Sequence, residues 1–272
     1  MGTLETAEGR QIHFEHHKPS SGGGDVAVML IHGWGTSARV WDTTLVALQD
    51  AGHEVVAFDQ RGCGASDKDF EEVSIESSAA DAVAIADTLG IKRLAVNGWS
   101  LGGTIAVEAA RQLGGRCAGV VLTAGASPRF TQADGFPYGN PPGSTAETVQ
   151  ALRADRANFL HELSKAVFAV PQSDAVINWT WSLFMQAAPC ADLALQQLDT
   201  VDQREFLAGL QAPLLSIVGG KDQVTVPDIG RQAAEIAANG RLEEFADSGH
   251  APFIEEGPRY REVLLQFLAS LK

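Results

Sequence analysis

The sequence predicts an α/β fold in which a mostly parallel, doubly wound sheet carries an inserted helical cap. Over most of its 272 residues, short apolar runs typical of buried parallel strands alternate with segments of helical periodicity. This alternation implies right-handed crossovers between neighbouring strands. It stops after residue 124 and resumes at residue 214, which indicates an insertion between two core strands. We therefore expect residues 1–125 and 211–272 to form the core and residues 126–210 to form the cap.

The first half of the chain is expected to supply most of the sheet. A hairpin is expected around Glu8-Gly9, because β-like residues 4–6 and 11–16 flank this turn. Apolar runs predict strands at residues 26–31, 54–58, 94–96 and 119–123. Helical spacing of small and apolar residues predicts helices at residues 40–48, 79–89 and 104–113, and Gly90 closes the second of them.

The inserted residues 126–210 lack the strand-helix rhythm. They open on a stretch rich in Gly and Pro and continue with helix-like segments near residues 145–170 and 173–188. The core pattern then returns, with strands at 214–218 and 241–245, a helix at 227–238 and a last amphipathic helix. One stripe of that last helix is apolar and consists of Tyr260, Val263, Leu264, Phe267, Leu268 and Leu271.

Composition narrows the classes of function. A net charge of -14 disfavours binding to nucleic acid and to anionic membranes. No apolar run is long enough to span a bilayer and the first residues do not resemble a signal peptide, so a soluble cytoplasmic protein is expected. Cys63, Cys117 and Cys190 are odd in number and widely spaced, as reduced thiols would be. No His/Asp cluster has the spacing of metal ligands, and no cofactor is expected.

The stretch Gly98-Trp99-Ser100-Leu101-Gly102 is the candidate nucleophile site. It lies between an apolar strand and a helical run, and it matches Gly-x-Ser-x-Gly, a strand-to-helix turn that exposes a nucleophilic serine. The serine needs strained backbone angles, so the residues two before and two after it must lack side chains that would clash. Small residues also pack at many ordinary strand-helix turns, so the other members of a catalytic site must support this interpretation.

A nucleophilic serine needs a histidine as base and an acid that orients the histidine. In this type of fold the chain order is serine, acid, histidine. His250 is the histidine that follows Ser100 at the end of a late strand, and Asp222 follows the strand at residues 214–218. Because parallel strands present their carboxyl ends at one edge, these three residues can converge there. Asp199 and Asp202 are alternative acids.

Two backbone N–H groups are candidates to bind an oxyanion. The Leu101 amide lies at the start of the helix after Ser100, and the Trp34 amide lies in the loop after the strand at residues 26–31. His32 precedes the nucleophile and is expected to hold this loop by hydrogen bonds. Aromatic residues are candidates for the lining of an apolar pocket: Trp99, Phe159, Trp179, Trp181 and Phe184.

These motifs together resemble the α/β-hydrolase superfamily over essentially the whole chain. The resemblance is carried by His32-Gly33-Trp34-Gly35, the segment 59–66 (Asp-Gln-Arg-Gly-Cys-Gly-Ala-Ser), the segment 98–103, Gly220-Lys221-Asp222 and the segment 249–253. Within it, the chain is most similar to the pimeloyl-acyl-carrier-protein methyl ester carboxylesterases. The resemblance implies cofactor-free hydrolysis of carboxylic esters through an acyl-serine intermediate, with Ser100, Asp222 and His250 as the triad and Trp34 and Leu101 as oxyanion donors.

The charge of the predicted cap bears on the substrate. Residues 126–210 contain five basic and nine acidic side chains, a surface that disfavours an acidic carrier protein, so small free esters are expected. The same triad could also serve a lactonase, a carbon-carbon bond hydrolase or a perhydrolase. A hydrolase-like protein that only binds a ligand is the alternative from another class. Acyl length, the alcohol group and oligomeric state stay open.

Overall fold

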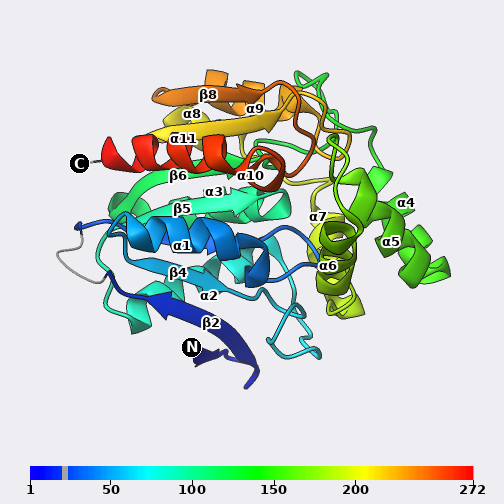
Figure 1. Ribbon diagram of the computed structural model, residues 1–272, viewed down its shortest axis with the longest axis horizontal. Helices are drawn as coiled ribbons and strands as arrows, with labels where there is room; N and C mark the ends of the chain where they lie inside the picture. The colour runs from blue at the N-terminus through cyan, green and yellow to red at the C-terminus, as the bar shows by residue number, and fades with distance from the viewer. Residues whose placement is uncertain (20–23, 272) are drawn as a thin grey trace.

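The computed structural model describes residues 1–19 and 24–271. Across these residues, eight strands form one sheet in the order β1-β2-β4-β3-β5-β6-β7-β8 (Figure 1). β1 and β2 form an antiparallel hairpin, β2 runs antiparallel to β4, and the remaining neighbours are parallel. The strands are β1 Gly2–Glu5, β2 Gln11–His17, β3 Ala27–Ile31, β4 Val55–Phe58, β5 Leu94–Trp99, β6 Cys117–Thr123, β7 Leu214–Gly219 and β8 Gly240–Phe245.

Helices cover both faces of this sheet, so its central strands are buried on both sides. On one face lie α1 and α11, and on the other lie α2, α3 and α9 (Figure 1). The bounds of these core helices are α1 Asp42–Asp50, α2 Ile75–Thr88, α3 Leu101–Leu113, α9 Pro227–Ile236, α10 Pro252–Glu255 and α11 Gly257–Ala269. The apolar stripe predicted for the last helix faces the sheet, and Tyr260 and Leu264 are fully buried there. The predicted doubly wound α/β architecture is confirmed.

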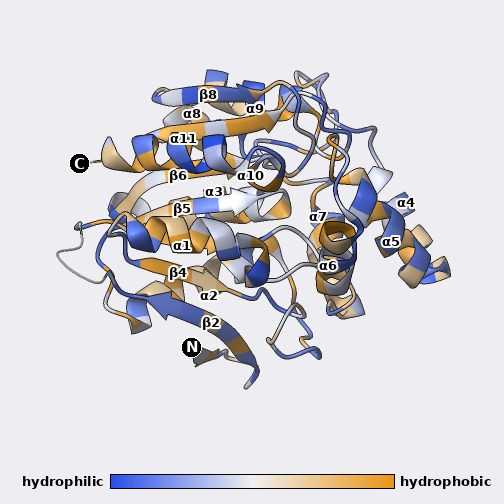
Figure 2. Cartoon of the chain, in the orientation of Figure 1, coloured by the Kyte–Doolittle hydropathy of each residue, from blue (hydrophilic) through white to orange (hydrophobic). Residues whose placement is uncertain are grey.

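The edges of the sheet differ from its centre in polarity. β3 and β4 are buried along their whole length, whereas β8 exposes most of its residues. Figure 2 shows the same contrast, with hydrophobic β4 between helices and mostly hydrophilic β2 and β8 toward the two edges. Polar side chains on edge strands disfavour pairing with a further strand.

The segment between β6 and β7 supplies the helices of the predicted insertion. Four of these helices, α4 to α7, gather beyond one end of the sheet, while the carboxyl terminus of the chain lies at the opposite end (Figure 1). The last, α8, contacts α9 of the core. The bounds are α4 Ser144–Ala154, α5 Arg156–Ala166, α6 Asp174–Phe184, α7 Asp192–Gln197 and α8 Arg204–Gly209.

Some predicted boundaries differ from the observed ones for local reasons. The helical segment expected near residues 145–170 is two helices, because Asp155 leaves the helical conformation and its side chain accepts the Asn158 N–H as the cap of α5. The helix expected at 40–48 begins as the short 3₁₀ helix Ala38–Trp41 and continues as α1. α2 begins earlier than expected, because Ser74 and Ser77 form a reciprocal capping box at its start.

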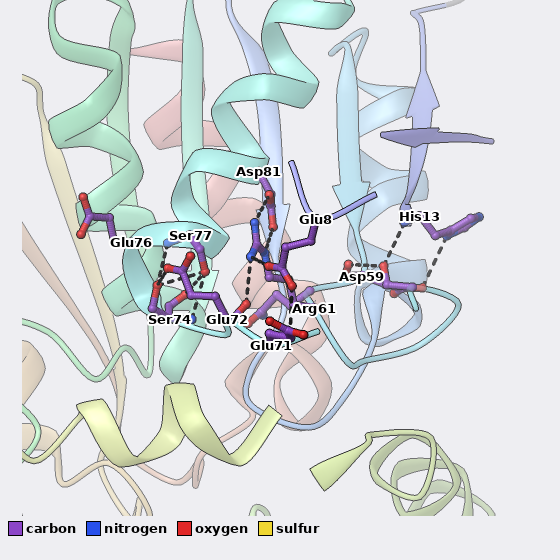
Figure 3. A network of polar contacts seen from close by, with 12 residues as sticks. Glu8, His13, Asp59, Arg61, Glu71, Glu72, Ser74, Glu76, Ser77 and Asp81 are labelled. Atoms are coloured by element: carbon purple, nitrogen blue, oxygen red, sulfur yellow. Dashed lines mark hydrogen bonds and ion pairs between the residues drawn. The ribbon is translucent and has the colours of Figure 1, made fainter. Parts of the chain in front are cut away.

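A buried arginine connects the loop after β4 to its surroundings (Figure 3). Arg61 forms a bidentate pair with Asp81 of α2, with distances of 2.7 Å from Nε and 3.0 Å from Nη2. Its Nη1 donates to Glu8 in the β1-β2 turn and to the Glu72 carbonyl. In the same loop, Asp59 accepts the N–H groups of Ala38 and Ala65. These contacts connect the loop after β4 to the β1-β2 turn, to α2 and the residues before it, and to the 3₁₀ helix Ala38–Trp41.

Among the described residues, none of the helices combines the length and the apolar character that a membrane crossing requires.

Candidate active site

Ser100 lies at the sharp turn from β5 into α3. It has φ 56° and ψ -124°, a strained conformation for a residue with a side chain. The turn is so tight that a Cβ on Gly98 would lie 1.9 Å from the Gly102 carbonyl oxygen, and a Cβ on Gly102 would lie 2.4 Å from that of Ile31. The two glycines of the motif are therefore required by close backbone contacts.

A buried polar cluster supports this turn from below. The Asn97 side chain in β5 donates to the Tyr260 hydroxyl at 2.9 Å and accepts from the Thr123 hydroxyl at 2.9 Å. Burial raises the pKa of Tyr260 to about 12, so it stays protonated. The cluster links β5, β6 and α11 beneath the nucleophile turn. A sequence signal for it exists: an asparagine in an otherwise apolar strand that leads into the turn.

Asp222 and His250 form a buried pair at the carboxyl edge of the sheet. His250 Nδ1 and Asp222 Oδ2 are 2.8 Å apart, and each residue is 2% exposed. The other carboxylate oxygen of Asp222 accepts the Val224 and Thr225 N–H groups at 2.7 and 3.0 Å. The carboxylate is thus fixed by backbone donors on one side and directs its free oxygen at the imidazole. This geometry favours the imidazole tautomer with the proton on Nδ1.

Trp99 connects the nucleophile turn to the histidine loop. Its Nε1 donates to the His250 carbonyl at 2.7 Å, and the ring centroids of Trp99 and His250 are 5.4 Å apart. Because Trp99 directly precedes Ser100, one side chain ties the two loops together. The Ser100 hydroxyl itself forms no hydrogen bond with a described residue, and hydrogen bonds to a catalytic serine often tighten only when substrate binds.

Two backbone amides are available beside Ser100. The N–H groups of Trp34 and Leu101 have no hydrogen-bond acceptor within the described parts of the chain. A Cβ on Gly33 would lie 3.2 Å from the Ser100 Cβ, so the loop that carries Trp34 packs directly on the nucleophile. Leu101 is the first residue of α3, where the helix dipole favours negative charge.

His32 holds the loop that carries Trp34. Its Nε2 accepts the Gln60 N–H at 3.0 Å, so its proton is on Nδ1, which lies 2.7 Å from the Gly33 carbonyl oxygen. Complete burial lowers the pKa of His32 and keeps the ring neutral.

A cavity of about 260 Å³ opens above these groups, between the sheet edge and the inserted helices. Ser100, His250, Trp34 and Leu101 lie on its wall. The rest of the lining consists of apolar residues and of uncharged polar ones. It consists of Gly33, Trp99, Phe130, Asn140, Ser144, Thr145, Thr148, Phe159, Leu163, Val167, Phe184, Leu195, Leu198, Gln223 and Val224.

The structure places three of the five aromatic candidates in the lining, namely Trp99, Phe159 and Phe184. Trp179 and Trp181 lie outside it. Trp181 packs edge-on against His161 of α5, with the two ring centroids 5.1 Å apart. Composition indicates that a segment is aromatic, but it does not say which face of each helix turns inward.

The two alternative acids lie elsewhere and have other partners. Asp199 accepts the Thr145 hydroxyl at 2.6 Å and the Gly143 N–H at 3.2 Å, which fixes the start of α4. Asp202 pairs with Arg204 at 2.6 Å. Both carboxylates therefore serve local structure in the inserted segment.

The polar part of the lining was not anticipated from the sequence. Ser144, Thr145 and Thr148 lie on one face of α4, and the buried Ser144 hydroxyl has no hydrogen-bond partner among the residues that the structure describes. Helical spacing could have placed these residues on a common face, but nothing in the sequence turned that face toward Ser100. Among the described residues, no group of three or more His, Cys, Asp or Glu side chains is arranged to hold a metal ion.

The fold is that of a hydrolase family. A family model described as the alpha/beta hydrolase fold matches residues 26–257, and the chain belongs to this family.

The chain is similar to several proteins that are named as esterases. The chain is 29% identical to a pimeloyl-[acyl-carrier protein] methyl ester esterase of Neisseria meningitidis, over 90% of this chain and 94% of that protein. It is 27% identical to the bifunctional esterase/perhydrolase DCH of Acinetobacter calcoaceticus, over 99% and 100%. The solved esterase of Exiguobacterium antarcticum superposes with a TM-score of 0.92 at 26% identity, covering 99% of this chain and 100% of that one. The resemblance to α/β-hydrolase esterases is thereby confirmed.

Proposed function

We propose that the protein is a serine carboxylesterase that hydrolyses small carboxylic esters through an acyl-serine intermediate. One observation carries this proposal: His250, which is 2.8 Å from the buried Asp222 carboxylate, borders the same cavity as the strained Ser100. Three residues from separate strand ends thus supply a nucleophile, a base and an orienting acid in one place.

In the acylation step, His250 Nε2 removes the proton from the Ser100 hydroxyl while Oγ attacks the ester carbonyl carbon. The resulting imidazolium is stabilised by Asp222, whose carboxylate stays ionised. The tetrahedral intermediate collapses when its bond to the alkoxide breaks, and His250 delivers the proton to that leaving group. The products of this step are the free alcohol and the acyl-serine.

Deacylation repeats the sequence with water. His250 takes a proton from the water molecule as its oxygen attacks the acyl carbon, and returns that proton to Ser100 Oγ when the acyl-oxygen bond breaks. The acid leaves and the serine is regenerated. In both steps the amides of Trp34 and Leu101 donate to the oxyanion, and each such donor contributes about 3 kcal/mol in comparable sites.

The cavity supports a small, neutral substrate. None of the residues that line it in the described chain is Lys, Arg, Asp or Glu, so a charged acyl group would find no counter-ion there. We propose that residues 126–210 act as the cap, with Phe159 and Phe184 packing on the acyl group and neutral polar groups on α4 binding its oxygen atoms. The acidic excess of the same segment favours small free esters over a carrier-protein conjugate.

The test is hydrolysis of p-nitrophenyl acetate and butyrate by the wild type and by Ser100→Ala. The variant is expected to lose turnover by at least about 10³-fold, because no nucleophile replaces Oγ, while its circular dichroism spectrum is retained. Undiminished hydrolysis by Ser100→Ala would refute the assignment. A wild type without activity on esters and lactones of graded acyl length would favour a ligand-binding role.

A second activity on the same triad is perhydrolysis, in which hydrogen peroxide replaces water as the acceptor of the acyl group. The observation that favours it is the full-length similarity to a protein named a bifunctional esterase/perhydrolase. Formation of peracetic acid from acetate and peroxide by the wild type, but not by Ser100→Ala, would support it. The graded lactones distinguish a lactonase, and a substrate with a cleavable carbon-carbon bond next to a ketone distinguishes a carbon-carbon bond hydrolase.

A further inference from the structure

The inserted segment touches the histidine loop directly. The His250 N–H donates to the Val167 carbonyl at 2.8 Å. Val167 follows α5 and lines the cavity, so this hydrogen bond joins a wall of the cavity to the backbone of the base. The two segments are 83 positions apart in the sequence and approach each other only in the folded chain.

Glu255, at the end of α10, bridges the same two segments with its carboxylate. Oε1 accepts the Gly249 N–H at 2.8 Å, one residue before the base. Oε2 accepts the N–H groups of Ala169 and Val170, each at 2.8 Å. An ionised carboxylate is an acceptor at both oxygens, and its hydrogen bonds to backbone N–H groups are about twice as strong as neutral ones.

Gly249 shows how closely the two backbones approach. A Cβ at this position would lie 2.7 Å from the Ala169 nitrogen and 3.1 Å from the Val167 carbonyl oxygen. Only a residue without a side chain lets residues 167–170 lie flat against the histidine loop. The neighbouring Ser248 hydroxyl donates at 2.7 Å to Glu256, the residue directly before α11, which fixes the other side of the loop.

We propose that Glu255 is a positioning residue that couples the seating of residues 167–170 on the core to the placement of His250. The inference rests on the proposed esterase function, because it assigns His250 the role of base. When residues 167–170 are seated, Glu255 and the Val167 carbonyl hold Gly249 and His250 in register with Ser100. When they lift away, the hydrogen bond from the His250 N–H to Val167 and those from Ala169 and Val170 to Glu255 are broken, and the base loses its alignment.

The decisive variant is Glu255→Gln, with Glu262→Gln as the matched control. Glutamine has the same shape as glutamate but only one acceptor oxygen, so it cannot serve Gly249 and the pair Ala169 and Val170 together. Glu262 lies exposed on α11, and within the described residues its hydrogen-bond donor is Gln266. Glu255→Gln is expected to lower kcat and the rate of Ser100 phosphonylation by a fluorophosphonate by about 10- to 100-fold, because a shift of about 1 Å in a catalytic group has effects of this size.

Amide hydrogen exchange supplies a readout that does not depend on turnover. In the wild type, the amides of Ala169, Val170 and Gly249 are expected to exchange as one cooperative unit, and in Glu255→Gln all three should exchange faster. If the variant does not fold, the exchange measured on the wild type alone tests whether residues 167–170 and the histidine loop are coupled.

The outcomes separate the two proposals. A wild type and a Glu262→Gln control that neither hydrolyse esters nor react with the fluorophosphonate would contradict the esterase, whereas the exchange data would still test the coupling. An active wild type together with Glu255→Gln kinetics equal to those of the control would overturn the role of Glu255. So would a Glu255→Gln variant that loses stability to urea but keeps the control's kcat and phosphonylation rate.

Discussion

Gly102→Ala tests the claim that the nucleophile turn is set by backbone contact. Gly102 is the second residue of α3, and alanine there would gain up to about 1 kcal/mol in helix propensity. Its Cβ, however, would lie 2.4 Å from the Ile31 carbonyl oxygen and 2.5 Å from that of His32. Both atoms belong to the backbone, so α3 must move away from the end of β3 by roughly 0.6 to 1 Å before the contact is tolerable.

The destabilisation from this steric overlap should exceed the stabilisation from the higher helix propensity of alanine. Overpacking of this kind destabilises by about 1–3 kcal/mol, and here two carbonyls are in the way, so we expect a net loss of about 1–2 kcal/mol. The same displacement moves the Leu101 amide relative to Ser100, and kcat should fall by about 100-fold. Urea unfolding followed by tryptophan fluorescence measures the first effect, and ester hydrolysis measures the second.

Gly209→Ala is the control for this prediction. Gly209 is also helical, at the end of α8, and a Cβ there would have no neighbour within 4 Å in the described parts of the chain. This variant should be as stable as the wild type or more stable by up to about 1 kcal/mol. If Gly102→Ala behaved like Gly209→Ala in both stability and kcat, the steric account of the turn would be refuted.

Two further predictions concern the loops that surround the site. Burial lowers the pKa of His32, so below about pH 6.5 the unfolded chain binds a proton at this histidine more readily than the folded chain does. The free energy of unfolding should therefore fall with decreasing pH, by up to about 1.4 kcal/mol per pH unit. In urea titrations between pH 7 and 5, His32→Asn should lack this part of the pH dependence, and a slope equal to that of the wild type would contradict the argument. Arg61→Met leaves Asp81 buried without its cation and should lower the free energy of unfolding by about 3 kcal/mol. The exposed pair of Arg111 with Glu108 is its control, and Arg111→Met should change stability by less than about 1 kcal/mol; equal effects would contradict the argument.

The sheet and the catalytic candidates were predictable because local patterns specify them. Continuous apolar runs predicted the parallel strands, and β3 at Ala27–Ile31 lies within one residue of its predicted bounds. Ser100, Asp222 and His250 each follow a strand end, and the topology alone brings such ends to one edge. The structure places Asp222 and His250 in contact, as the order of the motifs indicates.

The inserted segment was less predictable because its contacts are tertiary. Nothing in the sequence indicates that Phe184 lines the cavity and Trp181 does not, since both lie on α6 and both are aromatic. The role of Glu255 could not be predicted from the sequence for the same reason. A glutamate five residues after a histidine has no evident partner until residues 167–170 are folded onto it.

Reaction of the pure protein with a fluorophosphonate, followed by peptide mass spectrometry, tests the central claim most directly. The account predicts that one phosphonyl group attaches to the wild type, that it maps to Ser100, and that ester hydrolysis stops as the label accumulates. A protein that hydrolyses esters but takes up no label, or that carries the label on another residue with Ser100 unmodified, would contradict it.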